Sequence, residues 1–110
     1  TGTVLDGITT GIAISTATDD QVLPQVTFNG SYLVIWTQRN GATQDEIYGA
    51  RIATNGTVTD TTPFLIANGG TSTGTFPVRA AAVTKGPGGE WGVIHDRGYA
   101  GVYLHEIAPK

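Results

Sequence analysis

The feature that most constrains this chain is that its second half repeats its first. The segment GTVLD at residues 2–6 returns as GTVTD at 56–60, and EIYGARIA at 46–53 returns as GVYLHEIA at 101–108. The spacing between matching segments differs only where connecting loops differ in length, and loops tolerate such insertions. A chain that uses one unit twice is expected to fold into two similar structures packed on each other.

Each unit is predicted to be a set of β-strands. The 110 residues include 18 Thr and 16 Gly with abundant Val and Ile, a composition that favours strands and turns. Asn29-Gly30 and Asn55-Gly56 lie between apolar runs and predict hairpins with type I′ turns. The predicted strands of the first unit are 25–29, 31–37, 46–54, a short 57–60 and 63–68, and those of the second are 78–84, 90–95 and 101–108.

The strand order predicts how the units close. Residues 1–15 match the last strand of a unit, a complete four-stranded unit follows within 16–68, and 69–110 supply three more strands. This order (D, A-B-C-D, A-B-C, with letters giving each strand's place in its unit) is typical of β-propellers, in which an early strand completes the last blade. We therefore expect one all-β domain of two blade-like antiparallel units. The alternative is a compact eight-stranded β-sandwich.

The central strands, YLVIW at 32–36 and WGVIH at 91–95, are almost continuously apolar. Such strands are usually covered on both faces of their sheet. The pattern P-x-V-x-F-N-G-S-Y-L-V-I-W, followed by D-E-I-Y-G-A-R-I, resembles a tandem repeat of large exported bacterial proteins. That resemblance covers residues 1–68 well and the second unit as a divergent copy. It implies propeller-type blades and no particular ligand or reaction.

Charge and composition exclude several functional classes. Six scattered basic residues and a net charge of −3 give no basic face for nucleic acid. No apolar run is long enough to cross a membrane as a helix. The absence of Cys removes disulfides and thiolate metal sites. The chain begins Thr-Gly-Thr and contains no Met, so we expect it to be processed, excised or truncated. Low Lys with high Thr, Gly and Asn favours an exported, extracellular or cell-surface protein.

Candidate ligand-binding residues are few. Trp36 and Tyr99 are aromatic residues without an aromatic counterpart in the repeat, and aromatic faces bind sugars. The cluster His95-Asp96-Arg97 contains groups that general acid–base catalysis uses, but neighbours on a strand point to opposite faces, so we predict no catalytic site. The candidate ligand-binding residues are Trp36, Arg39, His95, Asp96, Arg97 and Tyr99.

We predict no metal site and no cofactor. His95, His105 and Glu106 are the residue types of a metal site but lack a repeated ligand spacing. Asp19 and Asp20 lack the spaced carboxylates of a specific Ca²⁺ loop. The predicted function is a non-catalytic binding module for a glycan or protein. The alternative is a structural repeat subunit of a surface assembly, a filament or a larger complex. In either case exposed edge strands are expected to pair with another copy or another blade.

Overall fold

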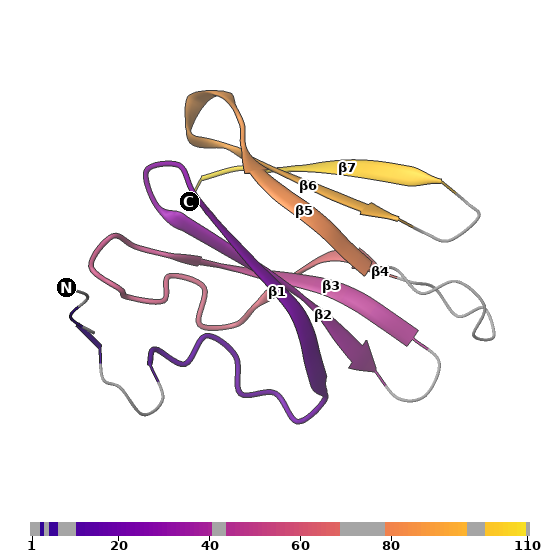
Figure 1. The fold of residues 1–110 in the computed structure, drawn as a ribbon, viewed down its shortest axis with the longest axis horizontal. Helices are drawn as coiled ribbons and strands as arrows, with labels where there is room; N and C mark the ends of the chain where they lie inside the picture. The colour runs from indigo at the N-terminus through magenta and orange to yellow at the C-terminus, as the bar shows by residue number, and fades with distance from the viewer. Residues whose placement is uncertain are drawn as a thin grey trace.

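The computed structural model describes residues 3, 5–6, 11–40, 44–68, 79–96 and 101–109, and these form two antiparallel sheets (Figure 1). In spatial order, sheet 1 contains β1 (Asp20–Phe28), β2 (Tyr32–Asn40), β3 (Gln44–Ile52) and β4 (Phe64–Asn68). Sheet 2 contains β5 (Arg79–Lys85), β6 (Trp91–Asp96) and β7 (Val102–Ile107), and a 3₁₀ turn at Pro87–Gly89 joins β5 to β6. The all-β prediction is confirmed, as is the antiparallel meander within each sheet.

The Asn-Gly pairs form hairpins, but the predicted type I′ turns are wrong. That turn needs a positive φ at both central residues, and here only the glycines have one, +83° at Gly30 and +88° at Gly56. At the second hairpin the Gly56 amide donates to the Ala53 carbonyl, and the Ala53 amide donates to the Thr57 carbonyl. This is the three-residue loop that ends in a left-handed glycine. The predicted strand 57–60 is reduced to a single bridge between Ile52 and Val58.

The two sheets have the same register at corresponding positions. The matched cross-strand pairs are Tyr32–Ile52 with Trp91–Ile107, and Trp36–Tyr48 with His95–Tyr103. The first strand of each sheet also carries an irregularity close to the same place, between Val22 and Gln25 in β1 and between Ala80 and Ala82 in β5. The backbone therefore follows one plan in both sheets, although the side chains differ.

The hydrophobic core lies between the sheets. The face of sheet 1 that points to sheet 2, here called its core face, contributes Leu33, Ile35, Ile47, Phe64 and Ala67. The core face of sheet 2 contributes Val83, Trp91, Val93 and Ile107. Each fully buried large apolar side chain contributes about 1.5–3 kcal/mol to folding. The opposite face of each sheet is called its outer face below.

Residues 11–17 lie across the outer face of sheet 1, on the side away from sheet 2 (Figure 1). Ile12 reaches Gly56, where an added Cβ would lie 2.9 Å from the Ile12 Cδ1, and Gln21 Nε2 donates to the Ala17 carbonyl at 3.0 Å. Residues 1–2, 4 and 7–10 lie outside the described residues, so the predicted pairing of residues 1–15 with the last strand of sheet 2 stays a prediction. Residues 11–15 form no strand and pack on sheet 1, and sheet 2 has three strands in the described part of the chain.

Two polar contacts connect the ends of the sheets. The Asn29 amide Nδ2 donates to the carbonyls of Gly86 and Glu90 at 2.9 and 2.8 Å, which places the two hairpin loops side by side. Arg51 Nη1 donates to the Ala108 carbonyl at 3.0 Å. The same guanidinium forms a two-point ion pair with Asp60 at 2.7 and 2.9 Å and lies 4.9 Å from the centre of the Phe64 ring. Asp60 also accepts the Arg51 backbone amide, so one carboxylate fixes the loop before β4.

Candidate functional site

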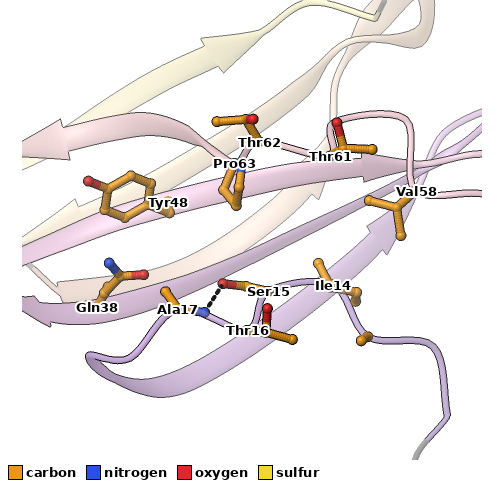
Figure 2. Close-up of a pocket in the computed structure, with 11 residues that line it drawn as sticks. Ile14, Ser15, Thr16, Ala17, Gln38, Tyr48, Val58, Thr61, Thr62 and Pro63 are labelled. Carbon is orange, nitrogen blue, oxygen red and sulfur yellow. Dashed lines mark hydrogen bonds between the residues drawn. The ribbon is translucent and has the colours of Figure 1, made fainter.

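A hollow opens where residues 13–17 pass over the outer face of sheet 1. Its volume is about 550 Å³, within the range of ligand pockets in proteins. In Figure 2, Ile14–Ala17 run along one side, and Tyr48, Pro63 and Val58 stand on the other. Polar lining groups are the hydroxyls of Ser15, Thr16, Thr61 and Thr62 and the amide of Gln38. The Ala17 amide donates to Ser15 Oγ at 3.5 Å, which holds this segment in a local turn.

Four side chains of β2 and β3 form a connected group at and next to the hollow: Trp36, Gln38, Glu46 and Tyr48. The Trp36 and Tyr48 rings stack at 6.5 Å with planes 18° apart. Tyr48 Oη donates to Glu46 Oε2 at 3.0 Å, and Trp36 Nε1 donates to Gln38 Oε1 at 3.4 Å. These four residues meet because alternate residues share a face and because Trp36 lies opposite Tyr48 and Gln38 opposite Glu46. Buried Gln38 and Glu46 therefore fix the two rings from the side.

The electrostatic setting favours a protonated Tyr48. Burial raises the pKa of the Tyr48 hydroxyl, and its hydrogen bond to Glu46 and the negative charges of Glu46 and Asp19 raise it further. A protonated phenol can continue to donate to the Glu46 carboxylate, whereas a phenolate would repel it. The ring therefore stays neutral, which suits it to stacking on an apolar ligand face.

The predicted ligand residues do not share one surface. Trp36 is buried on the outer face of sheet 1 and lines a second hollow under Ile12–Ser15. Arg39 is half-exposed and pairs with Asp45 across β2 and β3, its Nε 3.0 Å from Asp45 Oδ1. That hydrogen bond and the Asp45 charge raise the Arg39 pKa.

His95 is buried on the core face of sheet 2, and Asp96 is exposed on the opposite face. Arg97 and Tyr99 lie outside the described residues.

The expected divergence of neighbouring residues on β6 is confirmed, and His95 has another histidine as its partner. His95 Nδ1 donates to the Asp96 carbonyl at 3.1 Å, so the Nε2 of a neutral His95 ring is an acceptor. His105 Nε2 lies 2.8 Å from it and can donate that hydrogen bond, and the two rings stack at 4.9 Å. Glu106 points to the other face of β7. In the described residues no group of three His, Asp or Glu side chains could hold a metal ion.

The two carboxylates considered for Ca²⁺ have separate neighbours. Asp20 lies opposite Arg39 in the β1–β2 ladder and is exposed. The charge of Asp19 acts on Tyr48 instead. The two carboxylates therefore face different neighbours, Arg39 for Asp20 and Tyr48 for Asp19.

Sequence reasoning did not select Gln38, Glu46 or Tyr48 as site residues. Tyr48 has an aromatic counterpart in the repeat, Tyr103, and a repeated aromatic residue is expected to serve packing. The available signal was the polar residue two positions from each ring, Gln38 after Trp36 and Glu46 before Tyr48, because residues two apart share a strand face.

Comparisons of the chain with protein-family models, curated proteins and solved structures give no match. The resemblance to exported tandem repeats therefore remains a prediction from the quoted motifs. None of the described helical segments is long and apolar enough to cross a membrane.

Proposed function

We propose that this chain is a non-catalytic binding module of an exported or surface protein and that it binds a carbohydrate in the hollow beside Tyr48. One observation carries the proposal. An aromatic ring, an amide and several hydroxyls converge on a hollow of about 550 Å³. Sugars present an apolar face and many hydroxyl groups, so an aromatic surface combined with neutral hydrogen-bonding groups suits them.

The neighbouring side chains support a binding role for Tyr48. Its ring is held from behind by Trp36 and its hydroxyl by Glu46, so little side-chain freedom remains to be lost on binding. Thr61 and Thr62 are exposed and offer donors and acceptors on the same side of the hollow. The low Lys and high Thr and Gly content supports an exported location.

The proposal is tested by screening the full chain on a glycan array and then titrating the best monosaccharide or disaccharide while following tryptophan fluorescence. We expect a signal because Trp36 stacks directly on Tyr48. Tyr48→Ala should weaken binding by about tenfold or more, since the ring supplies the stacking surface. Thr61→Val, which removes one exposed hydroxyl, should weaken binding by a smaller factor.

Tyr103→Ala is the matched control, because Tyr103 holds the corresponding position in sheet 2 and does not line the hollow. It should leave sugar affinity unchanged. The absence of any array signal, or equal loss in the Tyr48 and Tyr103 variants, would contradict this function.

A structural role is the second candidate, and a separate observation favours it. The outer face of sheet 2 exposes Ile94, Val102 and Leu104 side by side on β6 and β7. A repeat subunit of an assembly would bury such a face, whereas a monomeric binding module has no use for it.

A further inference from the structure

The two sheets pack head to tail, with non-equivalent faces in contact. Leu33 and Ile35 on the core face of sheet 1 correspond in the repeat to Gly92 and Ile94, which lie on the outer face of sheet 2. Trp91 on the core face of sheet 2 corresponds to Tyr32, on the outer face of sheet 1. The outer face of sheet 2 therefore corresponds to the core face of sheet 1, and the outer face of sheet 1 corresponds to the core face of sheet 2. The two outer faces together repeat the two surfaces that meet in the core.

The outer face of sheet 2 is apolar and uncovered within the described part of the chain. Ile94, Val102 and Leu104 are 38%, 73% and 60% exposed. Their counterparts on the core face of sheet 1 are Ile35, Ile47 and Gly49, and both isoleucines are fully buried against sheet 2. The sequence of β6 is apolar on both faces, and the residues that the structure describes cover only one of them.

The outer face of sheet 1 is partly exposed at the end that carries the β1–β2 hairpin, where Val26 and Tyr32 line a hollow of about 470 Å³ together with Leu5, Asp6 and Ile12 of the N-terminal segment. Val26, Phe28 and Tyr32 are 59%, 48% and 41% exposed, and the rings of Phe28 and Tyr32 lie 5.0 Å apart. The counterparts of Val26 and Tyr32 in sheet 2, Val83 and Trp91, pack in the core, and the counterpart of Phe28 is the exposed Lys85. Residues 12–17 run along this face from Gly56, which Ile12 reaches, to Trp36 and Gln38 at the other end.

We propose that the outer face of sheet 2 in one copy of the chain docks on the hairpin end of the outer face of sheet 1 in a second copy. The contact repeats the packing that already joins the two sheets within one chain. Because its two halves differ, each copy can bind one neighbour on either side, and the product is a closed ring or a filament. Docking takes place through sheet faces and leaves the edge strands unused, and it does not depend on carbohydrate binding.

The contact between copies is weaker than the contact within one chain. Asn29 and Arg51 supply the polar contacts of the internal interface, and their counterparts are Gly86 and Glu106, which lack the needed donors. Apolar contact alone remains, so association should depend on concentration.

The test is the solution mass of the full chain by sedimentation across a concentration series, with one charged substitution on each face. The wild type should exceed the 11.4 kDa of one chain at high concentration. Leu104→Glu and Val26→Glu should each be monomeric, because each places a carboxylate in one half of the contact. An equimolar mixture of the two variants should form a dimer and nothing larger, since one intact interface remains between them.

Thr59→Glu, an exposed change away from both faces, is the control and should assemble like the wild type. Unchanged circular dichroism and melting temperature verify that the variants fold. A wild type that is still monomeric at about 1 mM overturns the proposal. The proposal is also overturned if Leu104→Glu abolishes assembly and Val26→Glu does not. That result would mean that the outer faces of sheet 2 from two copies pack on each other and that the outer face of sheet 1 takes no part.

Discussion

Sheet 1 and sheet 2 share a register but differ in what their corresponding residues contact. Trp36 and His95 occupy matching positions, and each stacks on the tyrosine across the ladder, at 6.5 and 5.7 Å. Trp36 is covered by residues 12–15 of the N-terminal segment, whereas His95 lies on the core face and bonds to His105. The register sets which side chains meet, and the covering element decides what they can do.

The second difference concerns polar contacts. Arg51 on sheet 1 is joined to Asp60, Phe64 and Ala108, while Glu106 at the matching position of sheet 2 is exposed. Sheet 1 therefore carries the contacts that fix a loop and reach the end of β7. At this one position of the repeat, Arg51 stabilises the fold in sheet 1, whereas Glu106 faces solvent in sheet 2.

The largest difference in stability between corresponding positions is expected at Trp91 and Tyr32, which are 1% and 41% exposed. Trp91→Ala removes a large core side chain and should lower the free energy of unfolding by about 3–5 kcal/mol. Tyr32→Ala should cost about 1 kcal/mol, typical of a substitution outside the core. Urea titrations of both variants measure the difference, and similar losses would contradict the unequal burial of these two residues.

The Arg51–Asp60 pair provides the next largest expected effect. Asp60→Asn removes the charge opposite a mostly buried guanidinium and should destabilise the fold by about 3 kcal/mol. Glu106→Gln, at the counterpart of Arg51, should change stability by no more than about 0.5 kcal/mol. Thermal melts of the two variants give the comparison. A mild Asp60→Asn effect would mean that solvent screens the pair.

The smallest expected effect is the alkaline response of Tyr48. Its pKa is raised in the folded state, chiefly by burial, so the folded protein holds this proton more tightly than the unfolded chain. That contribution is complete below pH about 10, the ordinary tyrosine value, and is lost as the pH rises through the folded-state pKa. Stability measured in urea between pH 9 and 12 should therefore fall less steeply in Tyr48→Phe than in the wild type. Equal slopes would contradict the assignment.

Much of the fold could be predicted from the sequence because it depends on local patterns. Asn-Gly pairs and the apolar runs on either side of them predicted β1 to β4 and their order, since turn chemistry and strand propensity act over a few residues. Turn type was predicted wrongly because the same Asn-Gly pair also fits a three-residue loop with a single left-handed glycine. The contact of residues 11–15 with sheet 1 could not be predicted, because a repeat match says which strand a segment resembles and not what it contacts.

The sequence by itself determined that the chain is all-β, that it contains one unit twice, and that neighbouring residues such as His95 and Asp96 point apart. These properties follow from backbone geometry and need no knowledge of distant contacts. Only the tertiary structure decided that Tyr48, Gln38 and residues 13–17 enclose a hollow and that His95 meets His105. It also decided which faces are buried, because burial depends on how two sheets meet across sequence separations that no local pattern records.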